Sequence, residues 1–280
     1  MMRFVHITDP HLDLQPLYGV DLRGRLERLI EHIARHEKNA AFVVVTGDLV
    51  NTASPQAYRA AAEILGRLPM PVFALAGNHD DPQLMYGAFP EVERVDLAPG
   101  RAAPCAPHVV HAPLFDAVLL QTRKKGAASG LVRQEDLDRL RGVCSAFPGR
   151  SAQGDPRALL VFMHHPPFLS GIEAMDAAGL ENPRSLRTAL EEARAAGRTA
   201  AGIFCGHLHR TMTGLWEGVA VWCLRAAAHA VAPDAIGRQM AGLHEAPEYA
   251  RIVMQPQADG SWNILSQTMR FTEDEEAFPL

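Results

Sequence analysis

The sequence lacks several features that would place the protein in a specialised class. Its four cysteines form no CxxC pair, so we expect reduced, mostly buried thiols and not a disulfide framework. No apolar run approaches the ~20 residues of a membrane-spanning helix. The N-terminus passes directly into a strand-like segment, without the apolar stretch of a secretory signal. These absences predict a cytoplasmic protein with no membrane partner.

Positive charge is also in short supply. The formal net charge is −5, with 27 Lys and Arg against 32 Asp and Glu, which argues against a surface that grips nucleic acid through many phosphates. A local anion site is still possible, because bound metal ions can invert the field around them. The chain is long enough, at 280 residues, to bury a sizeable core. We see no internal repeat and expect one domain over residues 1–280.

Strand-like and helix-like segments alternate along most of the chain, which predicts an α/β fold with parallel strand pairs and right-handed crossovers. In the helix that follows the first strand, Leu22, Leu26, Leu29, Ile30 and Ile33 recur at helical spacing. The other expected helices cover 55–67, 133–145 and 184–197. The expected strands are 3–8, 41–46, 71–76, 114–121, 158–163 and 201–205.

Four other segments break this alternation. Residues 82–113 contain six prolines and are expected to wrap the surface or to form a flap. We expect an exposed loop at 149–157 and a frayed acidic tail at the C-terminus. After His209, turn signals at Glu217-Gly218 and Asp259-Gly260 predict two hairpins. The stretch 225–249 between them has no strong periodicity and is a candidate lid or subunit contact.

Side chains that bind metals follow five of the strand-like segments. If these strands end in a shared crevice, as strands of open α/β sheets do, the clusters converge and can bind two metal ions. Each cluster alone is weak evidence, since Asp and His are common in loops, but five such coincidences are not expected by chance. The clusters are Asp9-Pro10-His11, Gly47-Asp48, Gly77-Asn78-His79-Asp80, His164-His165 and Gly206-His207-Leu208-His209.

The local chemistry suggests a role for several of these residues. Asp48 has two carboxylate oxygens and suits a bridge between two ions, although Asp also often caps the next segment. The amide oxygen of Asn78 can bind a metal without adding charge. We expect His79 to lie beside the ions, with Asp80 orienting its ring. Neighbouring side chains on an extended segment point to opposite sides, so we expect His164 to face the site and His165 to pack behind it.

The ordered set D-x-H, G-D, G-N-H-D, H-x-P and G-H-x-H resembles the calcineurin-like metallophosphoesterase superfamily over residues 4–209. The strings HHPPF and GHLHR resemble its bacterial branch of class III cyclic-nucleotide phosphodiesterases and glycerophosphodiesterases. The resemblance implies two packed mixed β-sheets flanked by helices, an αββα sandwich. It also implies a catalytic histidine, His79, beside two metals that share Asp48. The first metal would be held by Asp9, His11, Asp48 and His209, and the second by Asp48, Asn78, His164 and His207.

The implied activity is hydrolysis of small phosphodiesters, such as 3',5'-cyclic nucleotides, by attack of a metal-bound hydroxide. The mixed N/O ligands allow Mn, Fe, Zn or Co, and the resemblance favours Mn or Fe. Alternatives are a glycerophosphodiesterase, a phosphomonoesterase, a nucleotide pyrophosphatase and, less favoured, a nuclease or a non-catalytic scaffold. A homodimer is possible. The segments 121–126 and 225–234 differ from the family pattern, which leaves the substrate open. Candidate substrate contacts are Asn78, His165, Arg225 and His229.

Overall fold

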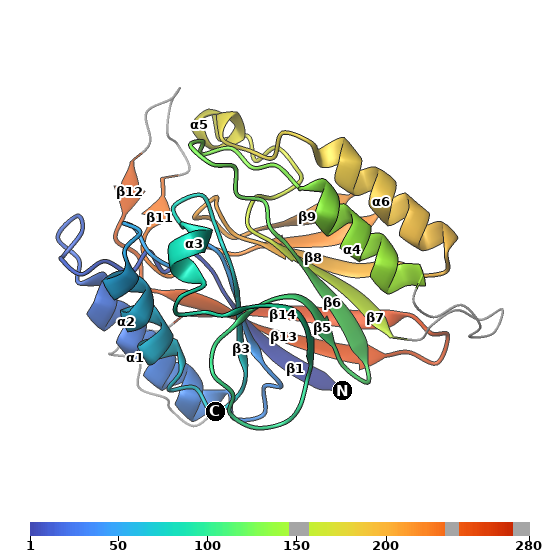
Figure 1. Ribbon diagram of the computed structural model, residues 1–280, viewed down its shortest axis with the longest axis horizontal. Helices are drawn as coiled ribbons and strands as arrows, with labels where there is room; N and C mark the ends of the chain where they lie inside the picture. The colour runs from blue at the N-terminus through green and yellow to red at the C-terminus, as the bar shows by residue number, and fades with distance from the viewer. Residues whose placement is uncertain (146–156, 233–240, 271–280) are drawn as a thin grey trace, which may run out of the picture.

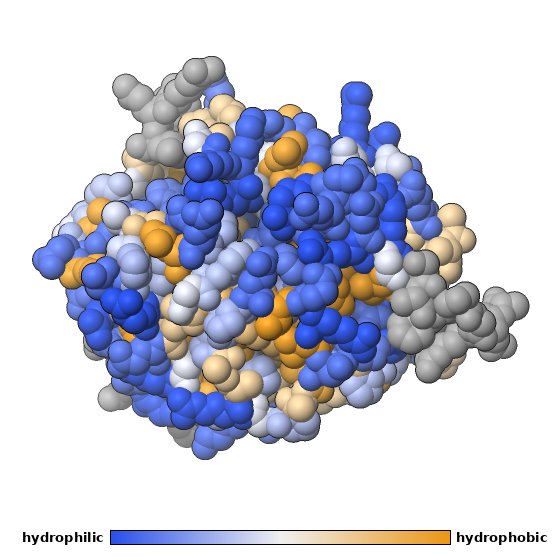
Figure 2. Space-filling model, in the orientation of Figure 1, coloured by the Kyte–Doolittle hydropathy of each residue, from blue (hydrophilic) through white to orange (hydrophobic). Residues whose placement is uncertain are grey.

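Two mixed β-sheets pack face to face between two layers of helices in the computed structural model of the chain (Figure 1). The structure describes residues 1–145, 157–232 and 241–270. The expected loop at 149–157, except Arg157, and the acidic tail therefore lie outside the described residues. No helix within these ranges is long and apolar enough to cross a membrane. The face shown in Figure 2 is largely hydrophilic, with scattered apolar areas.

The first sheet has the strand order β14-β13-β1-β2-β3. Three strands are parallel, β1 (Met2–Ile7), β2 (Val43–Thr46) and β3 (Val72–Leu75), and β13 (Glu248–Pro256) and β14 (Trp262–Arg270) continue the sheet antiparallel. Helices α1 (Leu22–His36) and α2 (Pro55–Leu65) cover its outer face (Figure 1). Side-chain caps start both helices, because Asp21 accepts from the Gly24 amide and Ser54 from the Ala57 amide.

The second sheet has the order β4-β5-β6-β7-β8-β10-β9. Its outer face is covered by the helices α4 (Gln134–Ser145) and α6 (Pro183–Ala195) (Figure 1). Smaller elements are α3 (Pro82–Met85), α5 (Glu173–Ala177) and the strand pair β11 (Ala230–Val231) and β12 (Gly242–Leu243). The strands of the second sheet are β4 (Glu91–Asp96), β5 (Ala106–His111), β6 (Phe115–Leu120), β7 (Ala158–Met163), β8 (Ala200–Cys205), β9 (Met212–Trp216) and β10 (Val219–Cys223).

An aromatic layer joins the two sheets. Alternate side chains of each buried strand point to opposite faces, so Leu160 and Phe162 of β7 face the other sheet while Val161 faces the helices. Phe4 of β1 stacks on Phe42 with ring centroids 4.8 Å apart, and it meets Phe162 and Phe204 of the second sheet edge to face. Such pairs add to the stabilisation from burial itself and fix the two sheets against each other.

The fold confirms the predicted pair of mixed sheets, the six strands and four helices of the alternating pattern, and both hairpins. The expectation for 82–113 was wrong, since this segment contains α3 and the paired strands β4 and β5. Strand β4 is the edge of its sheet and is mostly exposed. An edge strand carries polar side chains on both faces, so it lacks the apolar pattern by which a strand is predicted.

Candidate metal centre

The five predicted clusters meet where neighbouring strands of the two sheets end. Asp9 and Asp48 each follow by two residues the parallel strands β1 and β2, and Asn78 follows β3. In the facing sheet, His164 comes directly after β7, and His207 follows the adjacent parallel strand β8. Because the carboxyl ends of parallel strands lie at one edge, the two packed sheets bring these segments into one site.

Four of these side chains form a first buried group: Asp9, His11, Asp48 and His209. Their potential ligand atoms all lie within 4.8 Å of one another. The Nε2 atoms of His11 and His209 are 3.0 Å apart. His209 Nε2 lies 3.5 Å from Asp9 Oδ1, and His11 Nε2 lies 3.5 Å from Asp48 Oδ2. Two imidazoles and two carboxylates therefore direct nitrogen and oxygen atoms at one small volume.

A second group adjoins the first and centres on Asn78. Its Oδ1 atom lies 3.0 Å from His164 Nε2 and 3.0 Å from His207 Nδ1. The Oδ2 atom of Asp48 is 3.4 Å from His164 Nε2 and, as noted, 3.5 Å from His11 Nε2. The Asp48 carboxylate is thus placed between the two groups and is within reach of both.

Backbone carbonyls fix which ring nitrogens face the site. His164 Nδ1 lies 2.8 Å from the Thr46 carbonyl, and His209 Nδ1 lies 3.1 Å from the His229 carbonyl. A carbonyl only accepts, so both Nδ1 atoms donate a proton to it, and both Nε2 atoms face the carboxylates. The carboxylates are held as well, since Asp9 accepts from the His207 amide and the Thr8 hydroxyl. Hydrogen bonds of this kind orient metal ligands.

The backbone around the site is strained. Asp9, His11, Asp48, His207 and His209 all have positive φ, between 42° and 70°, a region that residues other than glycine rarely adopt. Neighbouring glycines make room for the turned chain. A Cβ atom at Gly77 would strike the Asp48 carboxylate, and one at Gly206 would strike Thr8 and Asp9. Strain of this kind clusters at functional sites.

Burial and charge shift the pKa values in the site. Burial lowers the pKa of His11 to about 3, partly offset by Asp48, and it also lowers that of His207. Burial alone would lower the pKa of His164 too, but the carboxylates of Asp48 and Asp9 outweigh it and raise the pKa to about 10. Burial opposes ionisation of the two carboxyls, yet the surrounding histidines hold both pKa values below the usual range. The site thus strongly favours positive charge beside its carboxylates.

His79 stands at the exposed side of the site. Its ring is 4.7 Å from the ring of His11, and its Nδ1 atom lies 3.2 Å from the Asn51 carbonyl. The proton on Nδ1 is therefore held by the backbone of Asn51, and Nε2 is left for a ligand. The expectation that Asp80 orients this ring was wrong.

Asp80 instead joins two of the metal-site loops. Its buried carboxylate accepts from the amides of Leu49, Val50 and Gly77 and from the Tyr58 hydroxyl. Burial, with a smaller contribution from Asp48, raises its pKa to about 7.

Two of the candidate substrate contacts are engaged with the protein itself. His165 is buried, its Nδ1 atom accepts from the Thr122 hydroxyl at 2.8 Å, and its Nε2 atom donates to the Ala128 carbonyl at 2.9 Å. Arg225 is also buried and pairs with Glu245 and Glu248. Both ring nitrogens of His165 and both terminal nitrogens of Arg225 are thus engaged within the protein, and Arg225 Nε, which has no partner among the described residues, is buried. The structure therefore does not support these two side chains as substrate contacts.

The candidate substrate contact His229 differs from His165 and Arg225, because it lies beside the metal-ligand groups. Its ring is 4.5 Å from that of His209, between centroids, and its Nδ1 atom has no partner among the described residues.

Sequence reasoning missed the residues that position the ligands. Tyr58, Thr46 and Thr8 lie within or just after ordinary helix and strand patterns, and their spacing gives no sign of a site. Gln121 and Thr122 were noted only as a departure from the family pattern. Gln121 accepts from the Ala76 amide at the end of β3, and Thr122 holds His165. That segment therefore braces the site from the second sheet.

The donor set fits two metal ions. Asn and Asp oxygens together with imidazole nitrogens suit Mn, Fe, Co and Zn, and no cysteine competes among the residues of the two groups. Two buried carboxylates, those of Asp9 and Asp48, face the Nε2 atoms of His11, His164 and His209. Two such carboxylates and four imidazoles in a buried volume require a positive charge at their centre.

Comparison with known proteins agrees with this geometry. The model of the family described as calcineurin-like phosphoesterase matches residues 2–211. The chain is 33% identical over 262 residues to a probable cyclic nucleotide phosphodiesterase of Rhodopseudomonas palustris, covering 91% of this chain and 89% of that protein. It is 29% identical to a glycerophosphodiester phosphodiesterase of Enterobacter lignolyticus, over 82% and 79% of the two chains.

Solved structures share the fold at low sequence identity. One is GAP50 of Plasmodium, with a TM-score of 0.57 and 10% identity, covering 98% of this chain and 86% of that one. Another is a putative 5'-nucleotidase of Staphylococcus aureus, with a TM-score of 0.55 and 14% identity, covering all of this chain and 56% of that one. These structures show the fold alone, whereas the family model over residues 2–211 and the relative from Rhodopseudomonas show that the chain belongs to the calcineurin-like phosphoesterases.

Proposed function

We propose that the protein is a metal-dependent phosphodiesterase that hydrolyses small phosphodiesters such as 3',5'-cyclic nucleotides. One ion would be held by Asp9, His11, Asp48 and His209, and the other by Asp48, Asn78, His164 and His207. The position of Asp48 carries this proposal. Its Oδ2 atom lies 3.5 Å from a nitrogen of the first group and 3.4 Å from one of the second, as a carboxylate shared by two ions requires.

Two bound ions would fix the phosphate oxygens and lower the pKa of an attacking water. The protein supplies the geometry for this chemistry. Carbonyls of Thr46 and His229 hold two imidazoles by their Nδ1 atoms, so that Nε2 is the nitrogen that would bind a metal. Asn78 adds an oxygen ligand without adding negative charge, so the centre keeps a positive excess that suits an anionic phosphodiester.

The remaining task is to protonate the alcohol that leaves. His79 is the only one of the predicted site histidines that is exposed in the described residues. The Asn51 carbonyl fixes the proton on its Nδ1 atom, so a protonated Nε2 is the group free to donate to the departing oxygen. A positioned general acid contributes typically 10²–10⁴-fold to the rate.

A glycerophosphodiesterase is the second candidate, since a relative with that name is 29% identical over most of the chain. Among the metals, the sequence resemblance supports manganese or iron. A cytoplasmic location and a homodimer stay predictions from the sequence.

The test is a substrate panel with protein stripped of metal and reloaded with Mn²⁺. We expect hydrolysis of bis-p-nitrophenyl phosphate and of 3',5'-cyclic AMP, and much slower release from the monoester p-nitrophenyl phosphate. Glycerophosphocholine tests the second candidate. Asp48→Asn should abolish turnover of every substrate, and the exposed-surface variant Leu215→Ala serves as the matched control, since Leu215 is 80% exposed on β9. A preference for the monoester would overturn the proposal.

A further inference from the structure

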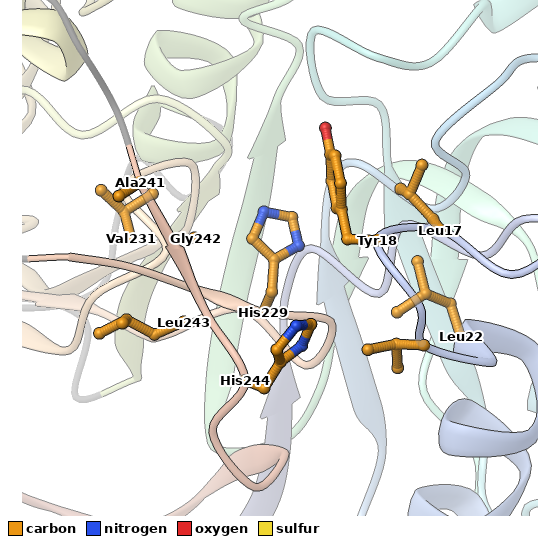
Figure 3. Close-up of a pocket in the computed structure, with 10 residues that line it drawn as sticks. Leu17, Tyr18, Leu22, His229, Val231, Ala241, Gly242, Leu243 and His244 are labelled. Carbon is orange, nitrogen blue, oxygen red and sulfur yellow. The ribbon is translucent and has the colours of Figure 1, made fainter.

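A cavity of about 350 Å³, whose lining Figure 3 shows, opens beside the first metal-ligand group, since its lining residue His229 contacts His209. It lies between the loop that precedes α1 and the segment that carries β11 and β12. Of the described residues that line it, none is charged apart from the titratable imidazoles of His229 and His244. Most of its wall is apolar, formed by Leu17, Val20, Leu22, Val231 and Leu243. The cavity therefore suits an uncharged, largely apolar group.

His229 connects this cavity to the metal centre. Its ring lines the cavity (Figure 3) and lies 4.5 Å from the ring of His209 and 5.8 Å from that of His11, between ring centroids. Its backbone carbonyl orients His209. The Nδ1 atom is buried and has no hydrogen-bond partner among the described residues. A group in the cavity would therefore be next to a phosphate held by the first metal-ligand group.

Tyr18 stands at the mouth of the cavity in an unusual conformation. It has φ 51°, and Gly19 has φ 77°, in a two-residue turn closed by backbone hydrogen bonds between Leu17 and Val20. Such a turn favours Asn-Gly and disfavours an aromatic residue in its first position. The Tyr18 side chain is 72% exposed, so burial of the ring does not offset the unfavourable backbone conformation. Its ring faces His229 across the opening at 5.7 Å between centroids (Figure 3).

We propose that this cavity binds the nucleobase of a cyclic nucleotide, with Tyr18 and His229 as its aromatic contacts. The inference rests on the proposed function and names the substrate class of the same site. A nucleobase is planar and uncharged, and every base has a π-face that stacks on aromatic rings. A glycerol group has no such face and would leave the apolar wall uncovered. The hydrolysed bond is a P–O ester, so the base takes no part in bond breaking and contributes through binding.

The experiment compares two substrates of the Mn²⁺-loaded protein. One is 3',5'-cyclic AMP, and the other is the same cyclic ribose phosphate with hydrogen in place of the base. We expect kcat/KM of the wild type to favour the base-bearing substrate. Tyr18→Asn suits the turn and removes the ring, and it should lower this preference about five- to 150-fold, the range expected for one stacked base. Tyr18→Phe should retain the preference.

Glu217→Asn is the matched control, because Glu217 occupies the same position in an equivalent turn, with φ 49° before Gly218, outside the cavity. It should leave the preference as it is in the wild type. Equal kcat/KM for the two substrates in the wild type, or a higher value for glycerophosphocholine than for cyclic AMP, would overturn the nucleobase assignment while the phosphodiesterase proposal stands. Equal loss on both substrates in Tyr18→Asn would also overturn it. If the wild type hydrolyses none of these diesters, the proposed function itself fails.

Discussion

Replacing Asp80 by Asn distinguishes two roles for this residue. The sequence pattern suggested that Asp80 orients the catalytic ring of His79, whereas the structure places it between the loops after β2 and β3. Its Oδ2 atom accepts from Gly77 at 2.9 Å and from Leu49 at 3.1 Å, and its Oδ1 atom accepts from Tyr58 at 3.1 Å. The substitution keeps the shape of the side chain and replaces one acceptor by a donor.

The expected cost follows from these contacts. The amide NH₂ group fits best on the Oδ1 side, where the Tyr58 hydroxyl can turn and the Val50 amide is already distant at 3.4 Å. One or two buried donors then lose their acceptor, at about 1–3 kcal/mol each. The free energy of unfolding should therefore fall by about 2–4 kcal/mol. Asp80 joins the two loops that carry Asp48 and Asn78. Metal affinity should therefore fall as well, by about 10–100-fold, as for other groups that orient ligands.

Urea unfolding of the metal-free protein measures the first effect, and metal content after dialysis against a weak chelator measures the second. With metal restored to saturation, turnover of p-nitrophenyl esters and of cyclic AMP should fall by similar factors. Tyr58→Phe removes one of the contacts and should show a smaller loss of the same kind. The reasoning is refuted if Asp80→Asn keeps full stability and metal content but loses activity only on substrates with poor leaving groups.

Three other outcomes follow from the site. His79→Ala should lower turnover of cyclic AMP about 10²–10⁴-fold but affect bis-p-nitrophenyl phosphate much less, because p-nitrophenolate leaves without a proton; equal losses in steady-state assays would contradict the acid role. Asn78→Ala should lose one of two ions, and metal analysis that finds both at full occupancy would remove that ligand. Burial lowers the pKa of His6 to about 3 in the folded protein. As the pH falls, this side chain is therefore protonated in the unfolded chain before it is protonated in the folded one. Urea unfolding should therefore show stability falling, by a few kcal/mol, as pH drops from about 6.5 toward 3, and less so in His6→Gln.

The elements with strong apolar periodicity were predictable from the sequence. Strand β7 was expected at the residues where it is found, and the first three strands and their helices differ from expectation by one or two residues at their ends. Convergence of the five clusters also followed, because parallel strands end at one edge. Strand β4 was not predictable, since Glu91, Glu93, Arg94 and Asp96 make it look like a loop, and its pairing with β5 alone fixes it.

The roles of residues around the site depended on contacts across the chain. Asn51 and Asp80 illustrate this. Asp80 is adjacent to His79 in sequence, but its carboxylate points inward to amides of another loop, while a carbonyl 28 residues away holds the ring of His79. Such partners are backbone atoms, which carry no signature in the sequence. The pairing of Arg225 with Glu245 and Glu248 is likewise set by tertiary structure.

The backbone strain at the metal ligands explains why the site needs this many supports. Each residue with positive φ costs about 1–2 kcal/mol, and five of the proposed ligands are in that region. The free energy of metal binding could offset this strain, but the turns must form before the metal binds if the ligands are to be close together. Hydrogen bonds across the loops, from the Asp9 amide to Gly47 and from the His11 amide to Asp48, hold the turns in place. The carboxylate of Asp80 also holds the turns in place, and Gly77 and Gly206 let the backbone lie close to the Asp48 and Asp9 carboxylates. The strained loops therefore lower the stability of the protein but preorganise the centre, while the buried clusters within and between the two sheets stabilise the fold that carries these loops.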